Sequence, residues 1–459
     1  MKKEDNFTLA TIGPQTASIS SLKSILTFSN VIRLNGSHNS IKWHKDIILK
    51  VKKISPNCSI LFDIPGVKPR TLNEKEIIIK NKQIIKFVDK TYNGSKKDTI
   101  ALSNPIPRII SSTKYFTISD GQYNFEIKKY GKGFIIGKSL SNFILYPKKG
   151  LNIESSIYSD KLQFEVYKSF ISKTQNIGYD AVGVSFIQNS NMLDALKKLF
   201  PKLIIVAKIE NSEGLKNLKS ICLSSDAVMI DRGDLSAEIG DINLYSSVNK
   251  IANEIKKIGK PLIMATENLE SMQVRSTPTK SEIMSLGHSL SLGADKIMLS
   301  EETAISSNWL QTLKWLNRFF TTVSILPQNH KDNTDNRFDT EISDIIWKTI
   351  KNTNDIPIIV FSRSGAAIQK AKSINPSIRI ISFTDNLRTL KLSRLWSNVS
   401  CFHLKKFDNS KGNNFVFSTI KKYKNEIFKS NKNAIILYIS NPKPGSRANT
   451  ITVIKKNDF

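Results

Sequence analysis

Eight short apolar segments recur along residues 8–301, and helix-like segments separate most of them. Such segments, rich in β-branched residues, are typical of buried strands. They span residues 8–12, 30–35, 58–63, 181–186, 203–210, 227–234, 261–266 and 296–301. Their starts lie 22 to 35 residues apart, which accommodates a strand, a helix and loops, except for one interval of 123 residues. This period predicts an α/β fold, a TIM (β/α)8 barrel with a separate module inserted after the third strand.

The inserted module and the region after the barrel have different patterns. Residues 72–149 contain strand-like alternation and an Asp120-Gly121 turn, which predicts a small β-barrel domain placed as a lid over the barrel mouth. A hydrophilic segment at 328–337 precedes alternating strands and helices, which predicts an open α/β domain. We therefore divide the chain into barrel (1–71), inserted β lid (72–149), barrel (150–327) and C-terminal α/β domain (338–459).

Composition excludes several classes of protein. The three cysteines are isolated, so a disulfide framework or a thiolate metal cluster is excluded. No apolar run approaches the roughly 20 residues of a membrane span, and charged residues occupy the N-terminus where a signal peptide needs apolar ones. We therefore expect a cytoplasmic globular protein without a membrane partner.

The chain is strongly basic, with 68 Lys and Arg against 39 Asp and Glu, a formal charge of +29. The lysines are scattered along the chain rather than gathered in a block. We favour a solvated basic surface, which would attract phosphorylated substrates over long distances. A basic scaffold that binds RNA is the alternative, and it predicts binding that weakens steeply with salt.

Polar and charged residues follow the predicted strands, at the barrel end where TIM barrels place their chemistry. They are Arg33, Asn35, Asp63, Lys208, Glu210, Asp231 to Asp234, Thr266 and Ser300 to Glu302. Lys208 and Glu210 alternate in phase at the end of an apolar run, so both side chains should point to the same side. Buried charges are costly unless they are paired or bind a ligand, so this pair indicates a functional site.

The residue types at these strand ends indicate a reaction class. Glu210 and Asp234 supply hard oxygen ligands that suit Mg²⁺. Backbone N–H groups at Gly233 and Asp234 could bind an anionic carboxylate where strand gives way to helix. Arg33 could bind a phosphate, Lys208 could stabilise developing negative charge, and the Thr266 hydroxyl could relay a proton. Together they predict metal-assisted chemistry on a phosphorylated carboxylic acid.

Several separated motifs, in order along the chain, resemble those of the pyruvate kinase family. They are TIGP (11–14), RLNGSH (33–38), DIPGVKPRT (63–71), KIENSEG (208–214), RGDLSAEI (232–239), ATENLESM (265–272), PT (278–279) and GADKIMLSEETA (293–304). The resemblance implies phosphoryl transfer from phosphoenolpyruvate to ADP, which yields pyruvate and ATP in the last step of glycolysis. It also implies a homotetramer.

The resemblance implies roles residue by residue. Arg33 and Lys208 would bind the phosphate, and Lys208 would stabilise the transfer state. Gly233, Asp234 and Thr266 would bind the substrate carboxylate. The divalent ion, Mg²⁺ or Mn²⁺, would bind to Glu210 and Asp234. Proton delivery would involve Thr266 and Glu302. The nucleotide would contact Asn35, His38, Arg70, Asp120 and Lys149.

A monovalent cation site is also implied, formed by Asn35, Ser37, Asp63 and the carbonyl of Ile64. Family members with glutamate at the position of Lys68 tend to need K⁺, whereas lysine there resembles the K⁺-independent type. A tethered ammonium could supply the charge that the ion would otherwise bring. We therefore expect that K⁺ is not required.

Three departures from the family pattern add negative charge: Asp231, Glu267 and Glu301. An extra carboxylate about 6 Å from an anionic substrate costs about 3 kcal/mol at an effective dielectric of about 20, roughly a hundredfold in binding. Glu301 replaces a glycine, so it is also expected to strain its turn. These changes favour an alternative, a catalytically impaired homologue with a regulatory or interaction role. Retention of Lys208, Glu210, Asp234 and Thr266 argues against that alternative.

Overall fold

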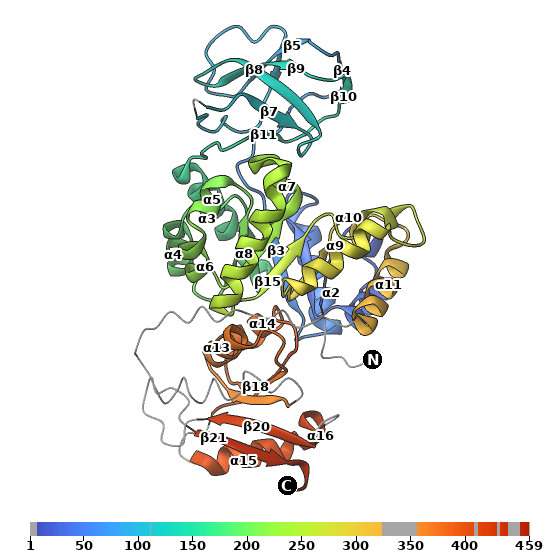
Figure 1. Cartoon of the computed structure of the whole chain (residues 1–459), viewed down its shortest axis with the longest axis vertical. Coiled ribbons are helices and arrows are strands. Elements are labelled where there is room, and N and C mark those ends of the chain that lie inside the picture. Colours follow the sequence, from blue (N-terminus) through green and yellow to red (C-terminus); the bar gives the residue numbers. More distant parts are fainter. Residues whose placement is uncertain are drawn as a thin grey trace.

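The computed structural model describes residues 7–110, 112–323, 356–407, 412–428, 432–438 and 450–458. Figure 1 shows a β-rich lid, a central barrel and a C-terminal domain arranged along the long axis of the molecule. The 328–337 segment, and with it the predicted boundaries at 327 and 338, lies outside the described residues.

Eight parallel strands form the closed barrel, in the order β1-β16-β15-β14-β13-β12-β3-β2. All eight predicted barrel strands are confirmed. They are β1 (Thr8–Thr11), β2 (Val31–Asn35), β3 (Ser59–Ile64), β12 (Ala181–Val184), β13 (Ile204–Ile209), β14 (Ala227–Asp231), β15 (Leu262–Ala265) and β16 (Lys296–Leu299). The fold class predicted from the period is therefore correct.

Helices and short 3-10 turns connect these strands. The helices are α1 (Ile19–Phe28), α2 (Ile41–Ile54), α3 (Asp160–Thr174), α4 (Ser190–Leu199), α5 (Ser212–Lys216), α6 (Leu218–Ser224), α7 (Arg232–Ile239), α8 (Leu244–Ile258), α9 (Lys280–Ser291), α10 (Glu301–Ala304) and α11 (Trp309–Thr322). The 3-10 turns are η1 (Pro14–Thr16), η2 (Gln175–Ile177), η3 (Asp241–Asn243) and η4 (Glu270–Gln273). No helix in the described part of the chain has the length and apolar character needed to cross a membrane.

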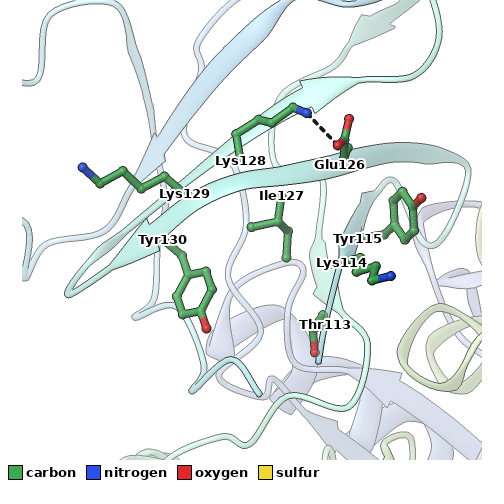
Figure 2. Close-up of a pocket in the computed structure, with 8 residues that line it drawn as sticks. All are labelled: Thr113, Lys114, Tyr115, Glu126, Ile127, Lys128, Lys129 and Tyr130. Carbon is green, nitrogen blue, oxygen red and sulfur yellow. Dashed lines mark hydrogen bonds and ion pairs between the residues drawn. The ribbon is translucent and has the colours of Figure 1, made fainter. Parts of the chain in front are cut away.

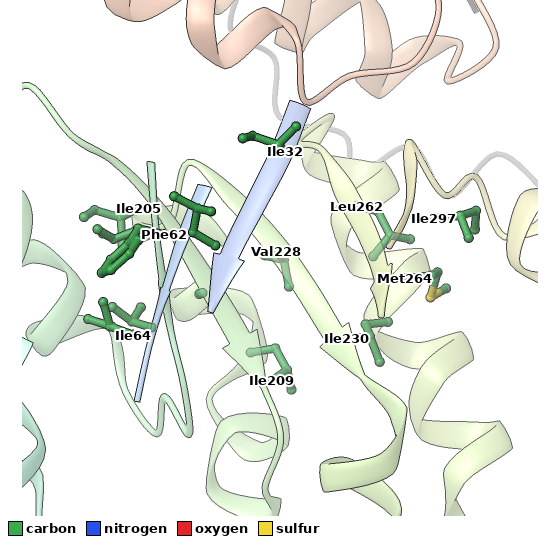
Figure 3. Close-up of a cluster of buried hydrophobic side chains, with 14 of the residues drawn as sticks. Ile32, Phe62, Ile64, Ile205, Ile209, Val228, Ile230, Leu262, Met264 and Ile297 are labelled. Carbon is green, nitrogen blue, oxygen red and sulfur yellow. The ribbon is translucent and has the colours of Figure 1, made fainter. Parts of the chain in front are cut away.

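The barrel strands are buried on both faces, and their alternation decides which side chains face the interior. One set, which includes Ile32, Phe62 and Ile230, packs in the core cluster that also contains helix residues (Figure 3). The residues between them, such as Val31 and Leu61, belong to a different buried cluster. This second set faces the barrel interior. Successive side chains alternate along a strand, so Arg33 and Asp63, two residues after Val31 and Leu61, also face the interior.

The lid contains two sheets. Six strands have the order β11-β7-β8-β9-β5-β6, and β10 pairs with β4. Their bounds are β4 (Ile77–Ile79), β5 (Ile84–Val88), β6 (Thr99–Ala101), β7 (Tyr115–Ile118), β8 (Tyr123–Gly131), β9 (Phe134–Ser139), β10 (Phe143–Leu145) and β11 (Leu151–Ile153). The predicted turn at Asp120-Gly121 joins β7 to β8, with positive φ at both residues. Strand β11 extends the lid sheet past residue 149, the end predicted for this domain.

The C-terminal domain is the expected open α/β unit, with strand order β19-β18-β17-β20-β21. Its elements are β17 (Ile358–Phe361), α13 (Ala366–Ile374), β18 (Ile380–Thr384), α14 (Leu387–Ser393), β19 (Val399–His403), α15 (Gly412–Lys422), α16 (Lys424–Ile427), β20 (Asn433–Tyr438), β21 (Thr450–Lys455) and η6 (Lys456–Asp458). It packs against the amino-terminal ends of the barrel strands, where the Ser59 hydroxyl donates to the Lys391 carbonyl at 2.8 Å. The opposite barrel end therefore lies on the lid side (Figure 1).

Candidate active site

Lys208 lies at the centre of a buried group of charges near the lid end of the barrel. Its amine is 2.8 Å from Glu210 Oε1, 3.4 Å from Asp231 Oδ2 and 3.5 Å from Asp63 Oδ2. Lys208, in strand β13, and Glu210, directly after the strand, therefore point to the same side, as their spacing predicts. Burial alone would lower the pKa of Lys208, but the surrounding carboxylates raise it well above its ordinary value, so the amine carries a positive charge.

Arg33 lies beside this group through Asp63. Its Nε and Nη2 atoms donate to Asp63 Oδ2 at 3.0 and 2.7 Å, and Nη1 donates to the Thr11 hydroxyl at 3.2 Å. Burial would raise the pKa of Asp63, but Lys208 and Arg33 lower it below its ordinary value. Asp63 therefore holds two cations close together inside the barrel, an arrangement suited to a phosphate.

Three carboxylates converge near the Lys208 amine. Glu210, Asp231 and Asp234 each place an oxygen within 4.8 Å of the others. Glu210 is fully buried, and its Oε2 accepts a hydrogen bond from the Phe186 amide at 2.6 Å. Burial raises the pKa of Glu210 to about 8, with further contributions from Asp234 and Asp231, although Lys208 opposes the shift. Clustered carboxylate oxygens are the donors that Mg²⁺ and Mn²⁺ bind, so these residues fit a divalent ion.

The start of helix α7 brings Gly233 to Thr266. The Gly233 amide donates to Thr266 Oγ1 at 3.1 Å, and Oγ1 lies 3.1 Å from Asp231 Oδ1. The Asp234 amide donates a long hydrogen bond of 3.5 Å to Asp231 Oδ1. The backbone N–H groups predicted to bind a carboxylate thus have partners within the chain.

Arg232, to which the sequence assigned no role of its own, organises the Thr266 loop. Its guanidinium donates to the carbonyl oxygens of Thr266 and Glu267, and to Asn268 Oδ1 at 2.9 Å. Thr266 and Glu267 have φ values of 58° and 50°, a left-handed conformation that non-glycine residues seldom adopt. Arg232 therefore helps to hold the strained backbone that presents the Thr266 hydroxyl. Its place in the RGD run directly after a strand was the available signal.

Lys68 connects the lid to the charged group. Its amine lies 2.6 Å from Asp234 Oδ1 and 2.8 Å from Asp120 Oδ1 in the lid turn, and its side chain is 3% exposed. Burial would lower the pKa of Lys68, but Asp234 and Asp120 raise it above its ordinary value. Among the described residues, the amine has no hydrogen bond or ion pair with the four residues of the predicted monovalent cation site. The Lys68 ammonium therefore neutralises the Asp234 carboxylate rather than the predicted monovalent cation site.

The remaining predicted residues lie apart from this network of contacts. Arg70 is exposed and donates to the Lys148 carbonyl at 3.3 Å, and Asn35 Oδ1 accepts from the Ser37 amide at 3.1 Å. Glu302 is buried and accepts from the Ser300 amide at 2.6 Å. His38 is exposed, and Lys149 is half-buried. None of the hydrogen bonds or ion pairs found among the described residues joins these side chains to Lys208.

Comparison with known proteins places this geometry in a family. The pyruvate kinase barrel-domain model matches residues 4–312, and the pyruvate kinase alpha/beta-domain model matches residues 340–454. The chain belongs to the pyruvate kinase family. Its fold is that of a pyruvate kinase from Cryptosporidium parvum, with a TM-score of 0.80 at 22% identity over 99% of this chain and 96% of that one.

Curated pyruvate kinases are similar at low identity. One from Buchnera aphidicola subsp. Schizaphis graminum is 30% identical over 85% of this chain and 86% of its own length. One from Encephalitozoon cuniculi is 30% identical over 67% of this chain and 73% of its length. One from Staphylococcus saprophyticus is 28% identical over 83% and 69%.

The departures from the pyruvate kinase pattern differ in their surroundings. Glu267 and Glu301 are exposed, whereas Asp231 is 7% exposed. The expectation that Glu301 strains a glycine turn is wrong, because it begins helix α10 and is absent from the positive-φ residues. Asp231 is therefore the only one of the three that adds a buried carboxylate to the site.

The lid carries a separate hollow of about 290 Å³ along strands β7 and β8 (Figure 2). It is lined by residues 113–115 and 126–130, and Lys128 pairs with Glu126 along strand β8 at 2.6 Å. None of these residues belongs to the charged group around Lys208. The hollow is therefore distinct from the candidate site.

Glu238 joins helix α7 to the lid and is expected to make stability depend on pH. Its Oε1 accepts from Asn152 Nδ2 at 2.9 Å and from the Tyr158 hydroxyl at 2.8 Å. Its Oε2 and the Oδ1 of Asn152 have no hydrogen-bond partner among the described residues. Burial raises the pKa of Glu238 to about 7, although both hydrogen bonds lower it.

Because the folded-state pKa exceeds the unfolded value, Glu238 contributes stability below about pH 4.5 that is lost as pH rises to about 7. Glu238→Gln is uncharged and keeps an acceptor for both donors. We expect the variant to gain up to about 3 kcal/mol on the wild type between pH 5 and pH 8. Thermal unfolding across this range measures the difference. A constant gap between the two proteins would show that Glu238 does not titrate in this window.

Proposed function

We propose that this protein is an active pyruvate kinase that transfers the phosphoryl group of phosphoenolpyruvate to ADP. The observation that carries the proposal is the contact of the Lys208 amine with Glu210 at 2.8 Å, beside Arg33 and next to two further carboxylates. The P–O bond to the enol oxygen breaks, a P–O bond to the ADP β-phosphate forms, and the enolate carbon takes a proton to give pyruvate.

Arg33 and Lys208 bind the phosphoryl group in this proposal. Lys208 stays charged because three carboxylates surround it, so it can follow the negative charge that develops during transfer. Glu210 and Asp234 would hold Mg²⁺ or Mn²⁺, which supplies charge neutralisation for the phosphate oxygens. Glu210 would do so from beside the Lys208 amine, to which it is ion-paired at 2.8 Å.

The substrate carboxylate would replace the internal partners at the start of helix α7. The Gly233 and Asp234 amides would then donate to the substrate carboxylate, and the Thr266 hydroxyl would donate to one of its oxygens. Thr266 and Glu302 take part in proton delivery in this proposal. Burial raises the pKa of Glu302 above its ordinary value, although backbone hydrogen bonds oppose the shift.

Nucleotide would bind between the barrel rim and the lid. The residues assigned to it are Asn35, His38, Arg70, Asp120 and Lys149. Asp120 supports this assignment because it lies in the lid turn and reaches the charged group through Lys68. From the family we also propose a cytoplasmic homotetramer.

We also propose that K⁺ is not required. The ammonium of Lys68, only 2.6 Å from Asp234, supplies a fixed monovalent charge at the site. The set of Asn35, Ser37, Asp63 and the carbonyl of Ile64 remains the candidate position for a monovalent cation if one binds.

A coupled assay of pyruvate formation from phosphoenolpyruvate, ADP and Mg²⁺ tests the function. A catalytically impaired homologue is the second candidate, and it rests on buried Asp231, whose charge would repel an anionic substrate bound beside Lys208. Pyruvate formation that depends on enzyme, ADP and metal supports the first candidate. Absence of turnover with either metal, in protein that is folded, supports the second.

A further inference from the structure

Asp231 ends strand β14 at the point where the family usually has a small neutral residue. It is buried, and its carboxylate belongs to the three-membered group with Glu210 and Asp234. The carboxylate oxygens of the three residues lie within 4.8 Å of one another. The departure from the family pattern therefore falls beside the proposed divalent ion rather than on the surface.

Among the described residues, each neighbouring acid has a cation within 2.8 Å, whereas the ion pair of Asp231 is longer. Asp63 pairs with Arg33 at 2.7 Å, Asp234 with Lys68 at 2.6 Å, and Glu210 with Lys208 at 2.8 Å. The ion pair of Asp231 found among the described residues is with the shared Lys208, at 3.4 Å. Asp231 is thus the carboxylate whose charge is least neutralised.

Three acids share the single Lys208 amine. Glu210, Asp231 and Asp63 lie 2.8, 3.4 and 3.5 Å from it. A neutral residue at position 231 would leave that amine with one acid fewer. Several buried carboxylates around one ammonium are costly, and a divalent ion among them would add the positive charge that they lack.

A second observation also favours an ion at this place. Glu210 Oε1 is buried, and its partner among the described residues is the Lys208 amine, which forms an ion pair with it at 2.8 Å but no hydrogen bond of good geometry. Buried carboxylate oxygens normally accept hydrogen bonds or bind a metal. This oxygen belongs to the same group as Asp231 and Asp234.

We propose that Asp231 is a third carboxylate ligand of the divalent ion held by Glu210 and Asp234, and that it lets the protein bind the ion before substrate arrives. The inference rests on the metal site of the proposed function. Mg²⁺ sites in phosphoryl-transfer enzymes usually take one or two protein carboxylates and leave other positions to substrate and water. With Asp231 as a third carboxylate ligand, the protein would fill one coordination position that substrate or water fills otherwise.

The test uses the full chain without substrates and Mn²⁺ as the probe. Electron paramagnetic resonance titration gives the dissociation constant, and water-proton relaxation gives the number of waters on the bound ion. We expect Asp231→Ala and Asp231→Asn to weaken Mn²⁺ binding at least tenfold, and Asp231→Ala to add about one water. Asp231→Asn keeps the side-chain volume and the acceptor for Thr266, so it guards against misfolding of the alanine variant.

Two further variants interpret the result. Glu301→Gln removes an exposed acid and should change the dissociation constant less than twofold, whereas Glu210→Gln should abolish tight binding. If Glu210→Gln weakens binding and both Asp231 variants bind as the wild type does, Asp231 is not a ligand and the inference is overturned. Weak binding by the wild type, or no effect of Glu210→Gln, overturns it as well.

The metal titration and the coupled assay can fail separately. Tight Mn²⁺ binding that depends on Asp231, in a protein without turnover, supports the ligand role and refutes the proposed activity. Conversely, turnover in a protein whose Mn²⁺ binding does not depend on Asp231 supports the proposed activity and refutes the ligand role.

Discussion

Lys208→Met is expected to lower kcat for pyruvate formation by about a thousandfold or more. The amine lies within 3.5 Å of three carboxylates, so its charge is fixed where the transferred phosphoryl group would lie. Removing one preorganised group of this kind costs about a hundredfold to a thousandfold. Loss of phosphate binding adds to that effect. Methionine has a similar length, so the comparison removes the charge and leaves most of the volume.

Lys216→Met is the matched control. Lys216 lies on helix α5, its side chain is 62% exposed, and it pairs with Glu213 at the surface. The same chemical change there should leave kcat within twofold of the wild type. Circular dichroism checks that both variants are folded, because Lys208→Met leaves Glu210 without its close cation. A folded Lys208→Met protein with wild-type kcat would contradict the proposed role of the amine.

The barrel could be predicted because its strands are buried on both faces. Each strand then appears in the sequence as a short apolar run, and the intervals between runs reveal the connecting helices. The in-phase spacing of Lys208 and Glu210 sufficed to predict that they meet, since alternation along a strand is local geometry. Their contact at 2.8 Å agrees with that argument.

Contacts between distant segments could not be predicted in the same way. The partners of Lys68 come from the lid turn and from helix α7, so its position depends on how two domains meet. Asp231, Glu267 and Glu301 look equivalent as added charges, yet only tertiary packing decides that Asp231 is buried. Arg232 received no role because its partners lie 34 to 53 residues away, where no local pattern indicates them: the carbonyls of Thr266 and Glu267 and the side chains of Asn268 and Ser285.

The role of Lys68 can be separated from that of K⁺ with one charge reversal. In K⁺-free Tris buffer the wild type should form pyruvate at a rate that added K⁺ changes less than twofold. Lys68→Glu should be about a hundredfold slower in the same buffer, because it places a third carboxylate beside Asp120 and Asp234. Two like charges about 5 Å apart repel by about 3 kcal/mol at an effective dielectric of about 20, which corresponds to about a hundredfold.

Added K⁺ should restore part of the Lys68→Glu rate, since a free cation can then neutralise the new carboxylate. Lys68→Met, which removes the charge without reversing it, should show a smaller loss. Lys80→Glu reverses an exposed lysine that follows strand β4, so it should behave as the wild type with and without K⁺. Strong activation of the wild type by K⁺ would refute the K⁺-independent assignment. A Lys68→Glu protein that loses activity but does not respond to K⁺ would leave Lys68 as a link between lid and barrel, with no part in replacing the ion.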